Sequence, residues 1–364
     1  MTTSAAAVFH NPKDGFSIEH YDLPEVEPRG ALVRVGMASI CGTDLHIWHG
    51  SRKPPLPIIP GHEAMGVITK IGSALKTDAA GAPLREGDRV TWSYIWTCGA
   101  CYFCTILKEP ASCANRLAYG VSVGCADPPH LNGGFSEYIY LRPGTSIFRI
   151  PDSLADEVVV PTNCALVTMV HVTRAAGVAL GQNIVIQGCG PLGLYGSTVA
   201  REMGAGQVIG LDTSEPRLEL ARKFGVDRGI NVTGLSDDDV VAKIRELTGG
   251  IGADVVIEAT GVPDVLKVGL RLPREGGTYA TIGPIYQGAT VALDCFNLIF
   301  RRIRLLGVAR NDAGHLRTAI AFLERTRSKY PYEQVVGARY SLDRVTDGLR
   351  LVDERKVMRA AIVP

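Results

Sequence analysis

The chain has 364 residues, of which 46% are hydrophobic and 21% are charged, and its formal net charge is +1. One hydrophobic core rarely grows beyond about 250–300 residues, so this length predicts two domains. The nearly neutral charge argues against a nucleic-acid partner, which would normally require a strong basic excess.

Membrane and secretory features are not expected. The N-terminal stretch lacks a basic segment followed by a long apolar run, so it does not resemble a signal peptide. The longest apolar run, 158–172, is interrupted by Pro161, Asn163 and His171 and is too short and too polar to span a bilayer. Nine cysteines in such a chain indicate metal ligands or buried thiols rather than a disulfide framework. We therefore expect a cytoplasmic protein without a membrane partner.

The first part of the chain predicts short strands joined by turns. Runs rich in β-branched residues occupy 31–40, 64–72 and 87–92, and residues 77–84 read as a surface loop. After about residue 310 the pattern predicts a helix at 315–327 and a final strand at 358–364.

From about residue 165 onward, strands alternate with helices. Strands are predicted at 183–188, 207–212, 253–260, 277–283 and 303–309. Helices are predicted between them at 192–204, 216–225 and 239–249. This alternation is typical of an α/β fold with a parallel, doubly wound sheet and crossover helices.

A glycine-rich turn follows the first of these strands. Residues 188–193 read GCGPLG, so Gly188, Gly190 and Gly193 match the pattern G-x-G-x-x-G, with Pro191 and Leu192 between them. Glycines allow a tight turn and a close approach to a pyrophosphate, which the unpaired N–H groups of the helix N-terminus then bind. The strand before the turn and the helix after it favour a dinucleotide site over a plain strand–turn–helix.

An acidic residue follows at the position that selects between cofactors. Asp212 lies 19 residues after Gly193, at the end of the next predicted strand. A carboxylate there accepts from the ribose hydroxyls and repels a 2′-phosphate, which favours NAD over NADP. Arg217 is close enough to bind a 2′-phosphate instead, but Asp212 holds the deciding position.

Four cysteines form a local ladder. Cys98, Cys101, Cys104 and Cys113 have the spacing C-x2-C-x2-C-x8-C. Four thiolates can surround one Zn²⁺ completely, which is typical of a structural site. An iron–sulfur cluster and a redox C-x-x-C pair are the alternatives.

A second set of metal-binding residue types is dispersed. Cys41 begins CGTDLH, His62 and Glu63 lie in GHE, and Cys164 lies in PTNCA. Two cysteines and a histidine would leave one zinc position open, as catalysis requires. Taken singly, Cys164 could be a buried thiol and His62 a structural histidine.

Together these motifs resemble the zinc-containing medium-chain dehydrogenase/reductase family. The resemblance runs through CGTDLH at 41–46, GHE at 61–63, GDRV at 87–90, the cysteine ladder, GGFSEY at 133–138 and GCGPLG at 188–193. It implies a Rossmann NAD-binding domain at 163–310. It also implies a mainly-β GroES-like catalytic domain from 1–162 and 311–364, with a zinc lobe at about 95–115.

The family resemblance also implies roles for single residues. Catalytic zinc would be held by Cys41, His62 and Cys164, with Glu63 as an adjacent carboxylate, and the ladder would hold a structural zinc. Thr43 would bond the substrate hydroxyl and His46 would pass its proton toward solvent. Arg359 matches a position that contacts the pyrophosphate, and Arg217 would lie near the adenosine. The last gap of the ladder is one residue longer than usual and contains Pro110, which a loop should absorb.

The implied function is reversible, NAD-linked oxidation of an alcohol, most simply a secondary one, to a ketone or aldehyde. Two zinc ions per chain and a homo-oligomer, more often a tetramer than a dimer, are expected, with residues 291–300 as the candidate contact. A zinc-free quinone or enoyl reductase on the same fold and a non-catalytic nucleotide-binding protein are the rival functions. The substrate stays open among polyols, hydroxy amino acids and cyclic secondary alcohols.

Overall fold

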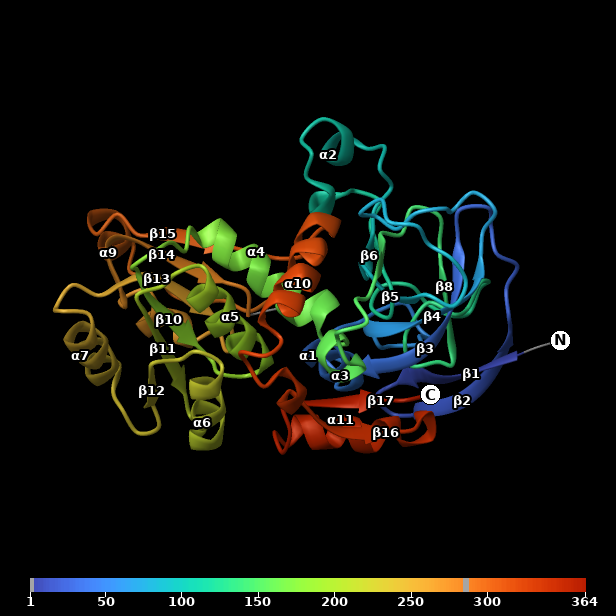
Figure 1. The fold of residues 1–364 in the computed structure, drawn as a ribbon. Helices are drawn as coiled ribbons and strands as arrows, with labels where there is room; N and C mark the ends of the chain where they lie inside the picture. The colour runs from blue at the N-terminus through green and yellow to red at the C-terminus, as the bar shows by residue number, and fades with distance from the viewer. Residues whose placement is uncertain (1–2, 284–287) are drawn as a thin grey trace. The chain divides into compact units, whose positions relative to one another are not determined.

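The computed structural model describes residues 3–283 and 288–364, which form two compact units (Figure 1). The first unit contains 1–167 and 310–364, and the second contains 168–309. The first boundary therefore lies at 167/168 and not at the expected 162/163, and the second lies one residue earlier than expected. The shift has a physical reason, because the turn at 162–166 packs against a strand of the first unit. Cys164 thus belongs to the first unit.

The first unit is built on a seven-stranded sheet with the order β16-β17-β3-β4-β5-β9, and β8 also pairs with β3. Its central strand, β3 (Ala31–Ser39), is buried along most of its length, which explains its almost continuous apolar sequence. The other strands are β4 (Glu63–Ile71), β5 (Arg89–Trp92), β8 (Tyr138–Leu141), β9 (Ile147–Arg149), β16 (Val336–Tyr340) and β17 (Arg359–Ile362). All of these pairs are antiparallel except β16 with β17.

Smaller elements complete the first unit. Strands β1 (Thr3–Asn11) and β2 (Gly15–Asp22) form a hairpin, and β6 (Ile95–Trp96) pairs with β7 (Leu117–Ala118). The helices are α1 (Gly42–Trp48), α2 (Tyr102–Thr105), α3 (Asp156–Val159), α10 (Ala313–Thr326) and α11 (Val345–Asp353). Short 3-10 turns lie at Pro110–Ser112, Tyr332–Gln334 and Leu342–Arg344. Helix α11 packs against β16 and β17.

The second unit contains a six-stranded sheet with the order β12-β11-β10-β13-β14-β15, in which every pair is parallel. The strands are β10 (Asn183–Gln187), β11 (Gln207–Asp212), β12 (Arg228–Asn231), β13 (Ala253–Glu258), β14 (Pro273–Thr281) and β15 (Arg304–Gly307). In chain order this is the 3-2-1-4-5-6 arrangement of a doubly wound fold. The expected α/β class is confirmed. Strand β12 was not predicted, because an edge strand with the sequence RGIN has no apolar pattern.

Helices connect successive strands of the second sheet. They are α5 (Pro191–Glu202), α6 (Glu215–Lys223), α7 (Asp237–Leu247), α8 (Val265–Gly269) and α9 (Cys295–Phe300). Ser236 caps α7 by accepting from the backbone N–H of Asp239, whose carboxylate accepts in return from Ser236. Apolar residues of the strands, such as Val185, Ile209 and Val256, form the core with Val240 and Ile244 of α7.

The apolar run expected to be too short for a membrane span is part of a longer helical segment. Residues 156–176 comprise α3, a π-helical turn (Thr162–Leu166) and α4 (Val167–Ala176). By length and composition alone this segment of 21 residues could cross a bilayer, but most of it is buried inside the fold. The helix is longer than the apolar run 158–172 because helical residues continue on both sides of it. Buried core helices of soluble proteins can have the same length and composition, so this segment is only weak evidence for a membrane span.

Candidate functional site

The dispersed metal-binding residues converge in the first unit. One ligand atom from each of Cys41, His62, Glu63 and Cys164 lies within 4.8 Å of the others. Cys41, His62 and Glu63 are buried and Cys164 is half-buried. Residues separated by more than 120 positions are thus brought to one point by the fold.

Each ligand is held at the end of a regular element. Cys41 is the N-cap residue of α1, and His62 immediately precedes β4, of which Glu63 is the first residue. Cys164 lies in the π-helical turn before α4. Such single π turns are rare and often mark functional sites. The neighbouring Asn163 is fully buried, and its amide donates to the carbonyls of His62 (3.1 Å) and Trp92 (3.2 Å).

Asp44 supports two of the ligands and was not predicted. Its Oδ2 accepts from the Cys41 backbone N–H at 2.8 Å, and its Oδ1 lies 3.7 Å from Nδ1 of His62. Oδ1 also accepts from the backbone N–H of Gly61 at 3.3 Å. A carboxylate behind a ligating histidine commonly fixes the orientation of its ring. The spacing of three between Cys41 and Asp44, which is that of a capping box, was the available sequence signal.

Glu63 is tied to the C-terminal part of the same unit. Nη2 of Arg359 donates to its Oε1 at 2.9 Å, and the Ser39 hydroxyl donates to its Oε2. Nη1 of Arg359 donates to the Ile40 carbonyl at 3.0 Å. Arg359 is buried on β17, so the structure shows its guanidinium as the partner of Glu63. Its contact with a pyrophosphate stays a prediction.

The protonation of these groups reflects their crowding. The hydrogen bond from Cys164, with the positive charges of Arg359 and His62, holds the pKa of Cys41 well below its usual value. The same hydrogen bond and burial raise the pKa of Cys164. Burial alone would lower the pKa of His62, but the negative charges of Asp44 and Cys41 outweigh it and raise the pKa to about 10. Without a metal the group therefore contains a Cys41 thiolate beside a cationic His62 ring. Thiolate and imidazole are ligands that zinc prefers.

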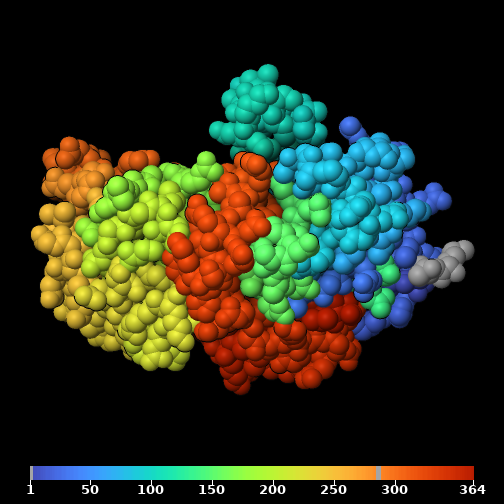
Figure 2. All heavy atoms as spheres, viewed as in Figure 1, coloured from blue at the N-terminus to red at the C-terminus, as the bar shows by residue number. Residues whose placement is uncertain are grey.

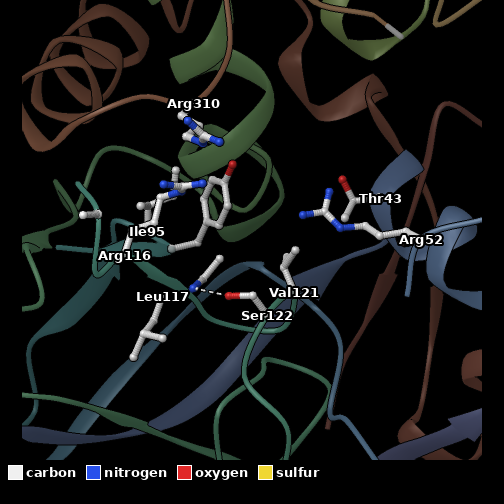
Figure 3. A pocket seen from close by; sticks show the side chains of 11 residues that line it. Thr43, Arg52, Ile95, Arg116, Leu117, Val121, Ser122 and Arg310 are labelled. Atoms are coloured by element: carbon white, nitrogen blue, oxygen red, sulfur yellow. Dashed lines mark hydrogen bonds between the residues drawn. The ribbon is translucent and has the colours of Figure 1, made fainter. Parts of the chain in front are cut away.

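A pocket of about 300 Å³ opens beside this group and contains Thr43 in its wall (Figure 3). Tyr94 also lines it, and the Tyr94 ring lies 5.0 Å from the His62 ring between centroids. The remaining lining combines apolar residues with Arg52, Arg116 and Arg310. A small molecule in the pocket would therefore contact both the Thr43 side of α1 and a neighbour of the metal-binding histidine.

His46 lies on α1 three residues after Thr43, so both side chains share one face of the helix. Its Nδ1 lies 2.9 Å from the Ser51 hydroxyl, a partner that the sequence analysis missed. His46 is half-buried, and burial lowers its pKa below the usual value of 6.5. The ring is therefore neutral near pH 7 and can accept a proton.

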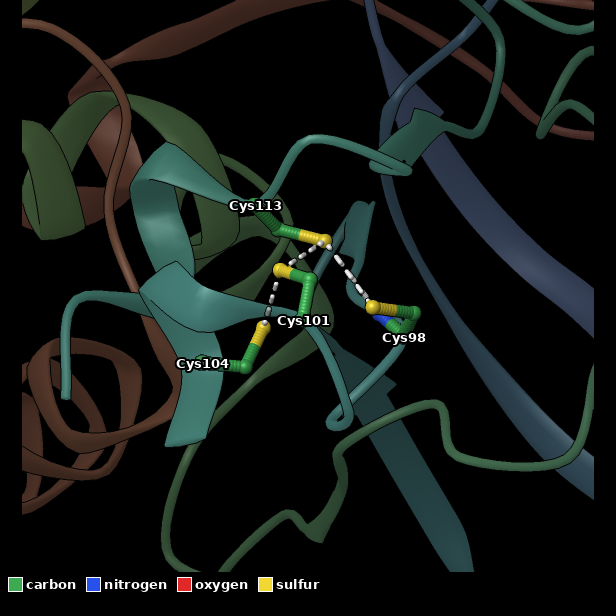
Figure 4. Close-up of side chains that lie close together, drawn as sticks. All are labelled: Cys98, Cys101, Cys104 and Cys113. Carbon is green, nitrogen blue, oxygen red and sulfur yellow. Dashed lines mark hydrogen bonds between the residues drawn. The ribbon is translucent and has the colours of Figure 1, made fainter. Parts of the chain in front are cut away.

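The four-cysteine ladder forms a small lobe of the same unit (Figure 4). The Sγ–Sγ distances are 3.5 Å for Cys98–Cys113, 3.6 Å for Cys101–Cys104 and 3.9 Å for Cys101–Cys113. A zinc–sulfur distance of about 2.3 Å gives a tetrahedron with edges of about 3.8 Å, so the spacing fits a single ion. The longer last gap does not prevent this convergence.

The lobe is closed at its base by the pairing of β6 with β7, and it projects from the surface of its unit in the space-filling view (Figure 2). Lys108, inside the longer gap, has a positive φ of 58°. Backbone N–H groups point at the sulfurs, including that of Cys98 toward Cys113 Sγ at 3.4 Å. The backbone of Ala100 and the side chain of Asn115 lower the pKa of Cys98 to about 6. Such N–H donors favour thiolates, the form that a metal binds.

In the second unit the three glycines of the turn have separate physical roles. Gly188 has a φ of +94°, and a Cβ at Gly193 would lie 1.9 Å from the Gly188 carbonyl oxygen. A Cβ at Gly190 would meet only Arg217 Nη1 at 3.9 Å. The first glycine therefore makes the turn and the third lets α5 pack closely. The second leaves space beside the N-terminus of α5, where Pro191 is the first residue and Leu192 follows.

Asp212 ends β11 beside this turn. Its Oδ2 accepts from the Cys189 N–H at 2.8 Å, and its Oδ1 accepts from the Ser214 N–H at 2.9 Å. These two bonds hold the carboxylate while leaving each oxygen able to accept once more. Burial raises the pKa of Cys189, the charge of Asp212 raises it further and the charge of Arg217 opposes this. The acidic and the basic candidate therefore lie at the same end of the site.

Comparison with known proteins agrees with this geometry. Residues 27–152 match the alcohol dehydrogenase GroES-like domain, and residues 191–325 match the zinc-binding dehydrogenase family. The chain is 31% identical over 350 residues to 5-exo-hydroxycamphor dehydrogenase of Pseudomonas putida, covering 95% of both chains. It is 34% identical over 306 residues to L-threonine 3-dehydrogenase of Pyrococcus horikoshii, covering 82% of this chain and 80% of the relative.

Solved structures give the same result. An alcohol dehydrogenase from Thermotoga maritima superposes with a TM-score of 0.95 at 30% identity, with full coverage of both chains. A zinc-binding dehydrogenase from Sinorhizobium meliloti bound to NADP gives a TM-score of 0.87 at 27% identity, again with full coverage.

These matches define a nicotinamide-dependent oxidoreductase that acts on alcohols. Within that class, the chain belongs to the zinc-containing medium-chain alcohol dehydrogenase family, and the expected GroES-like and Rossmann domains are confirmed. Neither a zinc-free reductase nor a non-catalytic nucleotide-binding protein is better supported by these relatives.

Proposed function

We propose that the protein oxidises a secondary alcohol with NAD, at a zinc ion held by Cys41, His62 and Cys164. The observation that carries the proposal is the convergence of these side chains and Glu63 within 4.8 Å, beside a pocket that Thr43 lines. Two cysteines and a histidine fit zinc and leave one position for substrate. Zinc there would act as a Lewis acid on the substrate oxygen and lower the pKa of the alcohol.

The chain's own residues handle the proton. Thr43 faces the pocket, so its hydroxyl can bond the substrate hydroxyl and accept its proton as its own proton leaves. His46, neutral near pH 7 and oriented by Ser51, is the next acceptor on the same helix face. Glu63 is buried beside the ligands and accepts a hydrogen bond from Arg359. The nicotinamide supplies the hydride acceptor when bound.

For the cofactor we propose NAD, bound with its pyrophosphate at Gly188, Gly190, Pro191, Leu192 and Gly193 and its adenosine ribose at Asp212. Asp212→Gly should lower the kcat/KM for NAD relative to that for NADP by about 10- to 100-fold, because charge-assisted hydrogen bonds to the ribose are lost. Asp227→Gly, at a surface acid after the next helix, is the control. An unchanged cofactor ratio would reject Asp212 as the selector and leave Arg217 as the candidate.

For the second metal we propose a structural zinc at Cys98, Cys101, Cys104 and Cys113, so that a fully loaded chain contains two zinc ions. The four sulfurs surround one point and leave no open position. Metal analysis of the fully active protein should return about two zinc ions per chain, and a value near one would remove one of the two assignments.

We also propose a cytoplasmic homotetramer. All nine cysteines are unpaired by disulfides, which suits a reducing compartment. Helix α9 exposes Phe296, Ile299 and Phe300, and β15 is the terminal strand of its sheet, so the stretch 291–300 offers an apolar contact. Light scattering at working concentration should give a tetramer, and a monomer would contradict the proposal.

The activity is tested on the zinc-loaded full chain by following NADH absorbance over a panel of secondary alcohols, polyols and hydroxy acids. We expect turnover that a chelator abolishes and added zinc restores. Turnover that is insensitive to complete removal of zinc would contradict the assigned metal site.

A further inference from the structure

Three arginines line the pocket beside Thr43, and the proposed reaction gives them no task. Arg52 lies four residues after α1, Arg116 immediately precedes β7, and Arg310 precedes α10. In Figure 3, Arg52 reaches into the pocket from the side of Thr43, while Arg116 and Arg310 lie on the other side. Three cations from three separate segments therefore meet at one cavity through the tertiary fold.

Among the described residues, Arg52 and Arg116 are not paired with acidic side chains, unlike other arginines of the unit. Arg89 pairs with Asp156 at 2.5 Å, and Arg149 pairs with Asp88 at 3.5 Å. Within residues 3–283 and 288–364, neither Arg52 nor Arg116 has a carboxylate within 4.0 Å.

The surroundings of Arg116 and Arg310 agree with a cationic site. Nη1 of Arg116 donates to the Cys113 carbonyl at 3.0 Å. Burial lowers the pKa of Arg310, and the charges of Arg116 and Arg52 lower it further. The other two cations therefore act on Arg310. Like charges held together in this way favour an anion between them.

Arg310 has an unusual backbone as well. Its φ is +65°, a left-handed conformation that non-glycine residues rarely adopt. Strained residues of this kind cluster at ligand-binding positions, where the surrounding structure holds them. The conformation therefore agrees with a side chain placed for binding.

The cations and Thr43 share one cavity, which lies next to the metal-binding group. Thr43 lines the pocket, and Tyr94 connects it to His62 by a ring contact at 5.0 Å. We infer that the substrate is a small hydroxy compound carrying an oxyanion, a carboxylate or a phosphate-type group, which Arg52, Arg116 and Arg310 bind while the hydroxyl reaches the metal group. Guanidinium groups match both kinds of oxyanion through paired hydrogen bonds. A volume of about 300 Å³ is in the range of sites that bind small molecules.

The inference rests on the proposed alcohol oxidation and is tested with matched secondary alcohols on the zinc-loaded full chain. The neutral probe is 2-butanol, the carboxylate probe is 3-hydroxybutyrate, and the phosphate probe is 2-hydroxypropyl phosphate. We expect kcat/KM for at least one anionic probe to exceed that for 2-butanol by about 10- to 100-fold, as charge-assisted hydrogen bonds supply. Which anionic probe is preferred distinguishes a carboxylate from a phosphate-type substrate.

The arginines are tested by Arg52→Met and Arg310→Met, with Arg29→Met as the control because Arg29 is exposed and does not line the pocket. Each pocket variant should lower the ratio of kcat/KM for the anionic probe to that for 2-butanol by about 10-fold, whereas the control keeps it. Arg52→Lys, which retains the charge, should restore part of the ratio and covers the case in which a methionine variant is unstable.

Binding gives a readout that does not depend on turnover. Calorimetry with 3-hydroxybutyrate and with inorganic phosphate should show binding to the parent chain and to Arg29→Met, and weaker binding to the pocket variants. If no alcohol is oxidised but this pattern holds, the proposed function fails and the anion site stands. Turnover with no preference for an anionic probe and no effect of the arginines would overturn the inference alone. A rise in the KM for NAD only would assign the arginines to the cofactor and would also overturn it.

Discussion

The first unit contains two groups of metal-binding side chains that differ in almost every physical respect. The four-cysteine lobe is assembled from 16 consecutive residues and is joined to its unit through the short β6–β7 pair. The group at Cys41, His62 and Cys164 is assembled from three distant segments, is largely buried, and borders a pocket. Four thiolates close the first group around an ion, whereas the mixed ligands of the second leave a position open.

The comparison teaches that the surroundings of a metal group, and not the presence of cysteines, separate structure from chemistry. Around the lobe sulfurs, backbone N–H groups lower the pKa values of Cys98 and Cys101, whereas desolvation and the neighbouring thiols raise that of Cys104. Around the buried group lie Asp44, Glu63 and Arg359. The charge of Asp44 raises the pKa of His62, while Arg359 acts to lower the pKa of Glu63 and Glu63 acts to raise that of Arg359. Burial raises the pKa of Glu63 to about 8, although Arg359 opposes it.

The largest difference between the two groups should be the loss of activity when a ligand of the buried group is removed. Cys41→Ser or His62→Ala should reduce kcat/KM by more than about 1,000-fold, because the Lewis acid is worth several kcal/mol to the reaction. Zinc content should fall by one ion, and calorimetric binding of NAD should persist because the glycine turn lies in the second unit. Cys125→Ser, at a buried cysteine outside both groups, is the control. Nearly normal activity in either ligand variant would move the site elsewhere.

The proton path should show a smaller effect, with a pH signature that the lobe lacks. His46→Gln should keep both zinc ions and lose up to about 100-fold in kcat near pH 7, as for a general base at the solvent end of a relay. In the parent enzyme oxidation should rise with pH through a pKa below 6.5, since the neutral ring is the acceptor. The variant should lose this step and recover in part toward pH 10, where hydroxide takes the proton. Equal rates at every pH would remove His46 from the mechanism, and loss of zinc would make it structural.

Removing a lobe ligand should affect stability rather than chemistry. Cys104→Ser should lose one zinc ion and lower Tm by at least about 4 °C, which corresponds to about 1–2 kcal/mol for a protein of this size. At 25 °C the remaining enzyme should retain most of its kcat. Metal analysis, a thermal scan and an initial-rate assay on one preparation test this. A variant with parent Tm but no activity would reverse the roles assigned to the two groups.

The smallest predicted effect compares two asparagines, one beside each group. Asn163→Ala should cost about 1–3 kcal/mol of unfolding free energy, because its buried amide donates to the carbonyls of His62, just before β4, and Trp92, at the end of β5. Asn115→Ala should cost little, because Asn115 is exposed and donates to Cys98 Sγ at 3.6 Å. Denaturant unfolding measures both. Equal costs would mean that the buried group does not depend on its tertiary support.

The sequence predicted the local features of this fold and site well. Strands β10, β11 and β13 and helices α5, α6 and α7 follow from apolar periodicity, and the glycine turn and the cysteine ladder follow from spacing. The ligands Cys41, His62 and Cys164 needed the family resemblance, because no spacing rule joins residues so far apart. The boundary near Cys164 was misplaced, because packing against β4 and not composition decides where the first unit ends.

By itself, the sequence determined the class of protein, the dinucleotide turn and the residue types that bind metal, since short motifs act through the backbone geometry of a few neighbouring residues. Only the tertiary structure placed Asp44 behind His62, Arg359 against Glu63, and three arginines around one pocket. These contacts join segments that have no common periodicity. The geometry of a reaction centre and the charge of its substrate pocket therefore depend on how distant segments pack, which no local pattern specifies.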